Sequence, residues 1–214
     1  MPLALSLFIF ELLLVLGHRH LWKGGIEHND ISVSNLMYDK TKNGAGVLND
    51  FDLAHVRGEP RPSGMERTGT MPFMALDLLT KEAWEGKVER LYRHDCESFM
   101  WVLLWIFARY DNGAEIKKPP FDEFFTSNFL QCYEKKSTCD RTIPNIKPTT
   151  SYKDYWSAAV QLLIHFRRHA TIRADARMLA ALANRTQLEP EDDNDAVVQE
   201  LQDVLKNAGF DIEL

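Results

Sequence analysis

Cysteine is scarce in this sequence of 214 residues. Its three cysteines, Cys96, Cys132 and Cys139, are odd in number and show no Cys-x-x-Cys spacing. A disulfide framework or a cysteine zinc site needs thiols at short, regular spacings. The pattern indicates neither, and it favours reduced thiols in an intracellular protein, which we expect to be cytoplasmic.

The sequence also lacks an excess of positive charge. Its formal net charge is −6, which gives no support to nucleic-acid binding, because such binding needs a basic patch. From Thr186 onward there are nine acidic residues and one lysine. We therefore expect a main unit over residues 1–185, followed over residues 186–214 by an acidic linker and a C-terminal amphipathic helix.

No hydrophobic run reaches the ~20 residues that a membrane span requires. The stretch "PLALSLFIFELLLVLG" has Glu11 in its middle and no basic residue ahead of its apolar part, whereas a signal peptide begins with a basic segment. We expect a buried helix over residues 3–22 and no membrane partner. A signal peptide is the alternative interpretation.

Apolar periodicity predicts a mainly α fold with one small β-hairpin. The hairpin is expected where Asn-Gly separates "LMYD" from "GVLND", because Asn-Gly favours a tight hairpin turn. A final helix should place Val198, Leu201 and Leu205 on one face, with Gly209 as its C-cap. The other expected helices cover residues 76–85, 94–110, 121–136 and, as one or two helices, 152–183.

The stretch "HNDISVSN" contains the first candidate site. Asp30 is followed five residues later by Asn35, and Asp50 stands in "NDFDLA" at the end of the second hairpin strand. Phosphoryl transfer needs a carboxylate that accepts the proton of the attacking hydroxyl and oxygen ligands that hold metal ions. Oxygen-only ligands of this kind favour Mg²⁺.

The order of these motifs resembles the C-terminal lobe of protein kinases. "HND" stands for the His-Arg-Asp signature and "DFD" for Asp-Phe-Gly, and "GTMPFMALDLL" and "HDCESFMWVLLWIF" follow. The sequence is most similar to the fungal-type protein kinase family over residues 15–110. The resemblance implies transfer of phosphate from Mg-ATP to a protein hydroxyl, with a protein substrate as partner.

The resemblance also implies a role for each matching residue. Asp30 would be the catalytic base, braced by Thr70, while Asn35 and Asp50 would hold magnesium and, with it, ATP. Two residues would support the loop. His28 would do so by packing, and Asp95 by accepting backbone N–H groups of the loop, with a plain helix N-cap as the alternative for Asp95.

Several positions depart from the general kinase pattern. Asn29 replaces an arginine that receives an activation-loop phosphate in many kinases. Ser32 occupies the position of a lysine, and Asp52 occupies the position of the glycine of Asp-Phe-Gly. Leu76 and Asp77 occupy the positions of the Pro and Glu in the Ala-Pro-Glu motif of kinases. "DIS" and "DFD" are usual in the fungal family, so they fit it better than they fit kinases at large.

Ahead of His28 the sequence shows no Gly-rich loop and no counterpart of the strand lysine that contacts the ATP phosphates in kinases or of the helical glutamate that pairs with it. In kinases these features form the small lobe that covers ATP. We therefore expect the isolated chain to transfer little phosphate and to need an N-terminal lobe or a partner protein. Two alternatives are a pseudokinase scaffold that binds a protein through residues 121–133, and a small-molecule phosphotransferase of the aminoglycoside or choline kinase type.

Overall fold

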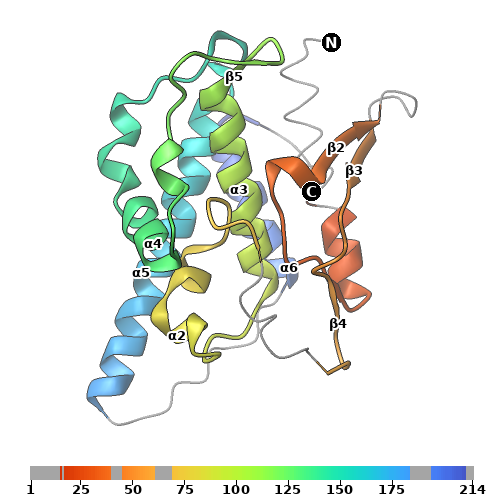
Figure 1. The fold of residues 1–214 in the computed structure, drawn as a ribbon, viewed down its shortest axis with the longest axis vertical. Coiled ribbons are helices and arrows are strands. Elements are labelled where there is room, and N and C mark those ends of the chain that lie inside the picture. The colour runs from red at the N-terminus through yellow and green to blue at the C-terminus, as the bar shows by residue number, and fades with distance from the viewer. Residues whose placement is uncertain (1–14, 16, 40–44, 61–68, 184–193, 211–214) are drawn as a thin grey trace.

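The computed structural model describes residues 15, 17–39, 45–60, 69–183 and 194–210. The longer helices are α3 (Tyr92–Arg109), α4 (Phe129–Ser137), α5 (Trp156–Leu182) and α6 (Asn194–Asn207). Figure 1 shows α4 and α5 on one flank of α3 and the β2–β3 hairpin on the other. The prediction of a mainly α fold is confirmed.

Helix α3 forms the centre of the core. All of its residues except Ile106 are buried, as expected for a segment that is apolar almost all round. The helix begins two residues earlier than the sequence indicated, at Tyr92. His94 extends it, because its Nδ1 accepts a hydrogen bond from the backbone N–H of Leu91 at 3.0 Å.

The segment predicted as a helix over residues 121–136 is helical only in its second half. Phe121 has a φ of +70°, a left-handed conformation that does not continue a helix. Asn128 then caps α4 by accepting from the N–H of Gln131 at 2.9 Å. Phe121 and Phe124 are buried, Phe129 and Tyr133 are partly buried, and Phe125 is 61% exposed. The aromatic surface suggested for a scaffold is therefore smaller than the sequence indicated.

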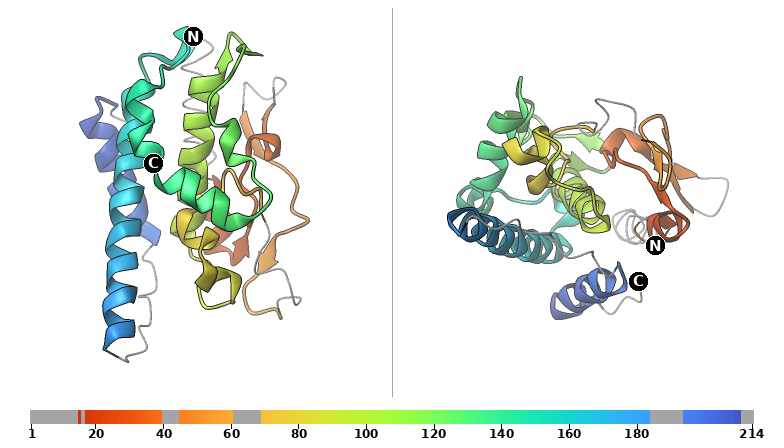
Figure 2. Two further views of the ribbon diagram at one scale, coloured as in Figure 1. Left: turned by 60° about the vertical axis from the view of Figure 1, so that its left-hand side comes forward. Right: turned by 90° about the horizontal axis from the view of Figure 1, so that it is seen from below.

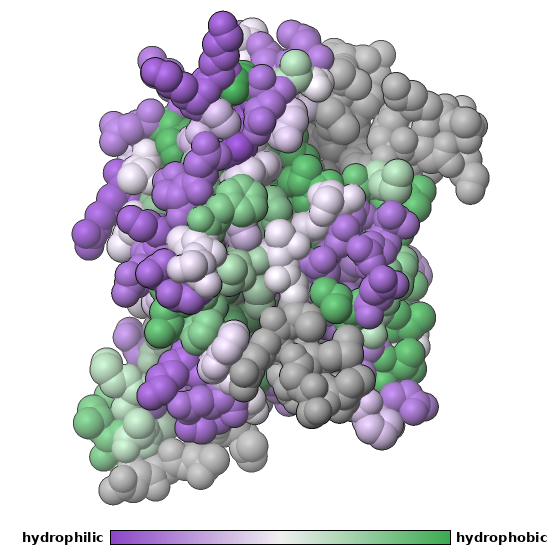
Figure 3. Space-filling model, viewed as in Figure 1, coloured by the Kyte–Doolittle hydropathy of each residue, from purple (hydrophilic) through white to green (hydrophobic). Residues whose placement is uncertain are grey.

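The region expected as one helix at residues 76–85 consists of a 3₁₀ turn, η3 (Leu76–Leu79), and a short helix, α2 (Lys81–Trp84). Residues 152–183 form the single helix α5 after the 3₁₀ turn η7 (Thr150–Tyr152). The last turns of α5 expose Met178, Leu179 and Leu182, and the lower left of Figure 3 shows hydrophobic surface. Loop 137–150 holds two further 3₁₀ turns, η5 (Cys139–Arg141) and η6 (Ile143–Asn145).

The predicted hairpin is present as β2 (Leu36–Asp39) and β3 (Ala45–Leu48), paired antiparallel with Leu36 opposite Leu48. Its turn lies outside the described residues. Two further antiparallel pairs were not expected: β1 (Ile26–Glu27) with β4 (His55–Val56), and β5 (Tyr110–Asp111) with β6 (Ala114–Glu115). Strands of two residues carry no alternating pattern by which a sequence could reveal them.

Helix α6 packs on the main unit rather than apart from it. Val198, Leu201 and Leu205 are buried, and α6 lies beside α5 (Figure 2). Gly209 ends the helix with a φ of +93°, and Phe210 N–H donates to Leu205 O at 2.9 Å, which is a Schellman cap. The division of the chain at residue 185 stays a prediction.

Near the N-terminus, residues 17–23 are helical. Most of the helix predicted over residues 3–22 lies outside the described residues. None of the helices that the structure describes is both long enough and apolar enough to cross a bilayer.

Candidate active site

His28 anchors the loop that carries Asp30. Its ring is fully buried and lies 4.8 Å from the Phe51 ring, edge to face. Nδ1 accepts from the backbone N–H of Asp30 at 3.3 Å, so the ring proton lies on Nε2 and is donated to Asn49 O at 2.9 Å. Burial lowers the pKa of His28, which keeps the imidazole neutral in this supporting position.

Asp30 receives three hydrogen bonds on its carboxylate. Thr70 donates two of them to Oδ1, from its backbone N–H at 2.7 Å and from Oγ1 at 2.8 Å. Asn35 donates the third, from Nδ2 to Oδ2 at 2.9 Å, and the same Nδ2 also reaches Asp30 O at 2.9 Å. The structure thus brings Asp30, Asn35 and Thr70 together and fixes the orientation of the carboxylate.

Gly69 allows this contact with Thr70. Its φ is +134°, and a Cβ added there would lie 3.2 Å from the backbone oxygen of Asn29. An L-residue is strained at such a φ. The glycine of "GTMPF" therefore serves the close approach of two backbones, which places Thr70 against Asp30.

Asn29 and Arg90 fix the other side of the loop. Asn29 has a φ of +70° and donates from Nδ2 to Leu53 O at 3.0 Å. Nη2 of Arg90 donates to Asn29 O at 2.8 Å and to Asp95 Oδ1 at 2.9 Å. Asn29 therefore ties the loop to the segment after Asp50, at the position where many kinases carry an arginine.

Asp95 supports the loop in a different way from the one we expected. It is fully buried and pairs with Arg90 at Oδ1 and with His18 Nε2 at Oδ2, the latter at 2.9 Å. It accepts no backbone N–H of the loop, and the residue at the N-cap of α3 is Leu91. Burial alone would raise the pKa of Asp95, but Arg90 and His18 hold it below its usual range. Asp95 thus acts on the loop through Arg90.

Asp50 lies at the same end of the hairpin as Asn35. The backbone N–H of Asn49 donates to Asn35 O at 2.8 Å, so the two segments meet where β2 begins and β3 has ended. Asp50 is exposed, with a φ of +61°, and its Oδ1 accepts from the N–H of Asp52 at 3.3 Å. It forms no hydrogen bond with Asp30 or Asn35.

The oxygen atoms available here fit a magnesium ion. Asn35 commits its Nδ2 to Asp30, which leaves Oδ1 with one long contact, 3.3 Å from Ser34 Oγ. Asp50 offers an exposed carboxylate. Carboxylate and amide oxygens are hard ligands that suit Mg²⁺. Ser32, at the position of the kinase lysine, is buried and bonds Ser34 Oγ at 2.9 Å.

A second polar cluster surrounds Asp77. Its Oδ2 pairs with Arg173 Nε at 2.7 Å and its Oδ1 with Arg177 Nη2 at 2.8 Å. Burial alone would raise the pKa of Asp77, but His94 and the two arginines of α5 hold it far below its usual range. Asp77, at the position of the Glu of Ala-Pro-Glu, thus fastens η3 to α5.

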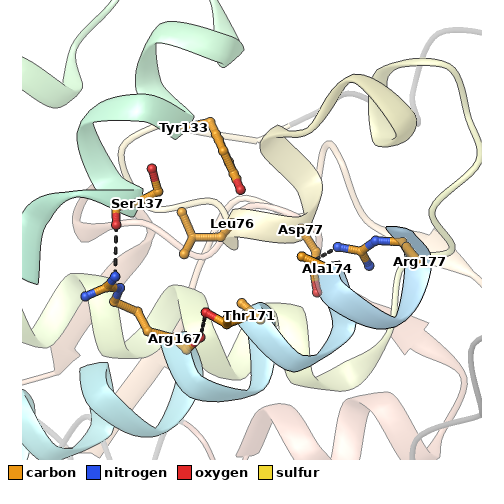
Figure 4. Close-up of a pocket in the computed structure, with 9 residues that line it drawn as sticks. Leu76, Asp77, Tyr133, Ser137, Arg167, Thr171, Ala174 and Arg177 are labelled. Atoms are coloured by element: carbon orange, nitrogen blue, oxygen red, sulfur yellow. Dashed lines mark hydrogen bonds and ion pairs between the residues drawn. The ribbon is translucent and has the colours of Figure 1, made fainter. Parts of the chain in front are cut away.

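A pocket of about 200 Å³ lies beside this cluster, between α4 and α5 (Figure 4). Leu76 and Tyr133 line it, and Arg167 donates to Ser137 O at 3.0 Å along its edge. None of Asp30, Asn35, Asp50 and Thr70 lines it. The pocket is therefore separate from the candidate active site.

Sequence reasoning missed Arg90 and His18, although both contact Asp95. Arg90 stands five positions before Asp95, and a cation so close to a buried carboxylate is a usable signal. His18 is 77 positions away, and no local pattern marks it.

Residues 11–107 match the family described as fungal protein kinase. The resemblance inferred over residues 15–110 is confirmed for this segment. The match covers the loop around Asp30, Asp50, Thr70 and most of α3. A comparison with curated proteins gives no match.

Proposed function

We propose, from the match of residues 11–107 to the fungal protein kinase family, that Asp30 orients and deprotonates a protein hydroxyl during phosphoryl transfer. The arrangement of the Asp30 carboxylate supports this proposal most directly. Thr70 and Asn35 hold it from two sides, and a base must be held in place to act on a substrate proton.

The count of lone pairs indicates which oxygen performs the reaction. A carboxylate has about four acceptor sites, two on each oxygen. On Asp30, Thr70 fills both sites of Oδ1, and Asn35 fills one site of Oδ2. The remaining site is on Oδ2, where a serine or threonine hydroxyl of the substrate would donate its proton as its oxygen attacks the phosphorus.

Thr70 also favours a protein substrate over a small molecule. A segment of the form Gly-Thr-x-Pro is typical of the loop on which kinases dock a peptide, and small-molecule phosphotransferases have no use for it. Here this segment bonds directly to the proposed base. A peptide seated along residues 69–73 would have its hydroxyl delivered to Asp30.

Asn35 and Asp50 are the residues proposed to hold magnesium with ATP. The metal ions would neutralise charge on the transferred phosphoryl group. Asn35 has its amide turned by the bond to Asp30 so that Oδ1 is available, and Asp50 presents a carboxylate at the hairpin end. Asn35 thus connects the proposed base and the proposed metal ligands in one side chain.

The 214 residues by themselves provide only this half of a kinase site. A lysine on the phosphates and a lid that excludes water each strengthen charge contacts, because these contacts weaken in high dielectric. Because the sequence shows neither the Gly-rich loop nor the lysine motif of a small kinase lobe, we expect the isolated chain to transfer phosphate on the order of a hundredfold more slowly than a chain that carries one.

The test is transfer of radiolabelled phosphate from ATP to a generic protein substrate. Two forms are compared: the 214-residue chain, and the chain fused behind the N-terminal lobe of a fungal kinase. We expect transfer by the fused form that Asp30→Asn reduces about 10²–10⁴-fold. Equal transfer by the Asp30→Asn variant would contradict the assignment of the base. Absence of transfer by a folded, ATP-binding fusion would favour the pseudokinase scaffold.

A further inference from the structure

Two histidines lie one turn apart on α5, far along the chain from the kinase motifs. His165 and His169 have ring centroids 4.5 Å apart. Glu200 of α6 lies opposite them, with its Oε2 3.4 Å from Nε2 of His165 and 4.0 Å from Nε2 of His169. Among the described residues, these three form the one group of histidine, cysteine or acidic side chains with the spacing of a metal site.

We propose that His165, His169 and Glu200 bind a Zn²⁺ ion, which fastens α6 to α5. The site is separate from the phosphoryl-transfer site and takes no part in the proposed kinase chemistry. It would hold the acidic C-terminal segment on the main unit when zinc is present.

The distances suit tetrahedral coordination. Zn²⁺ binds histidine nitrogen at about 2.0–2.1 Å and carboxylate oxygen at about 2.0–2.2 Å. A tetrahedron with such bonds has ligand atoms about 3.3–3.5 Å apart. The pair formed by His165 and Glu200 is already in this range, at 3.4 Å. The pair formed by His169 and Glu200 is 4.0 Å apart, and all three ligand atoms lie within 4.8 Å of one another, so rotation of the exposed His169 side chain would have to bring its nitrogen closer to the other two.

The ligand chemistry selects zinc over the abundant hard cations. Two imidazoles and one carboxylate are typical zinc ligands, whereas Mg²⁺ and Ca²⁺ prefer oxygen alone. Three protein ligands leave a fourth position for water. His169 and Glu200 are 43% and 50% exposed at their side chains, so an ion can enter from solvent without opening the fold.

The backbone around the cluster is held in place by other contacts. Leu201 and Leu205 of α6 are buried against the core, and Asp195 pairs with Arg19 and Lys23 of the helical segment 17–23. Residues 165 and 169 share one face of α5, since they are four apart in a helix. The site is therefore preorganised between two docked helices.

The experiment titrates the full chain with Zn²⁺ by calorimetry, and then with Co²⁺, whose visible absorption reports tetrahedral coordination. We expect one ion per chain at micromolar concentrations. His169→Ala and Glu200→Gln should each weaken binding at least about tenfold. Asp203→Asn on α6 and His20→Ala, outside the cluster, should leave the affinity unchanged.

Hydrogen exchange distinguishes zinc that fastens α6 to α5 from zinc that binds without stabilising this contact. Zinc should slow exchange of the α6 amides in the wild-type chain, and it should not do so in the two cluster variants. Failure of the wild-type chain to bind zinc would overturn the proposal, and so would unchanged affinity in the double variant His169→Ala/Glu200→Gln. Because Mg²⁺ and ATP are absent from these measurements, their result is independent of the proposed kinase activity.

Discussion

Thr70 donates two hydrogen bonds to a single oxygen of Asp30, a residue 40 positions earlier in the chain. Its backbone N–H lies 2.7 Å and its Oγ1 2.8 Å from Oδ1. The two donors come from one residue, so they fix both the position and the rotation of the carboxylate. The loop at residues 28–35 and the segment that begins at Gly69 are therefore parts of the same site.

Replacing Thr70 separates the side-chain bond from the backbone bond. Thr70→Val removes the Oγ1 donor but keeps the backbone N–H, so Oδ1 gains a free acceptor site and the carboxylate can turn. We expect kcat of the fused kinase to fall about tenfold, since a hydrogen bond to a charged group contributes about 1.5–3 kcal/mol. Thr70→Ser keeps the hydroxyl and should retain activity. Equal activity of the valine and serine variants would argue against bracing by Oγ1.

Arg90 should be necessary for the shape of the catalytic loop. Arg90→Ala leaves the buried Asp95 without one partner and removes a donor to Asn29 O. Removing one member of a buried ion pair costs about 3–5 kcal/mol. We expect a drop of that order in the free energy of unfolding, measured by urea denaturation. Lys87→Ala, at a position 67% exposed, is the control and should change stability little.

Because Asp77 is paired in the folded state, we expect the free energy of unfolding to fall in acid. The folded-state pKa is depressed, so the stabilisation is complete above the unfolded-state value of about 3.9 and is lost as the pH falls below it. Arg173→Ala should lower stability at neutral pH by about 2–3 kcal/mol, because the arginine is partly exposed and its pairing is weaker than a fully buried one.

The difference between wild type and Arg173→Ala should persist near pH 4, because Asp77 stays ionised in the folded state far below its usual pKa range. Arg168→Ala, on the exposed side of α5, provides the matched control. An equal effect of Arg173→Ala in an Asp77→Asn background would show that the interaction with Asp77 is not its source.

We expect the free energy of unfolding to increase in mild alkali, as the buried Lys136 loses its charge. It is fully buried, donates to Met74 O and lies 4.3 Å from the Trp101 ring centre. Burial lowers its pKa to about 8, below the unfolded-state value of about 10.4. The cost of the buried charge is therefore complete below about pH 8 and is relieved as the pH rises toward 10.

Urea denaturation should show a gain of about 2 kcal/mol for the wild type between about pH 7.5 and about pH 9.5. Lys136→Met retains the apolar length of the side chain without the charge, and it should lose most of this gain. An equal gain in both proteins would assign it to other titrating groups.

The sequence was informative wherever a pattern was long or local. The apolar run of α3 predicted a buried helix, and Asn-Gly between short apolar runs predicted the β2–β3 pair. The break at Phe121 was missed because an aromatic residue seldom adopts a positive φ. The short pairs formed by β1 and β4 and by β5 and β6 depend on tertiary contacts that no window of sequence contains.

In the candidate site, too, local motifs were predictable and long-range contacts were not. Motif order pointed to Asp30, Asn35 and Thr70, and the structure places them in contact. The support by Arg90 and His18 was missed, because it joins residues that the fold brings together from separate segments. Asp95 was expected to accept backbone N–H groups of the loop, but its carboxylate contacts the Arg90 guanidinium, which in turn donates to Asn29 O.

The pairing of Asp195 with Arg19 has a consequence for the order of folding during synthesis. The two residues are 176 positions apart, which corresponds to about 10–35 s of translation at usual rates. Until α6 emerges, the surface formed by Phe99, Leu103 and Leu162, which Leu201 and Leu205 later cover, stays open. The nascent chain therefore carries an open apolar groove between the synthesis of Leu162 and that of α6, and a chaperone that shields this groove should raise the yield of soluble protein.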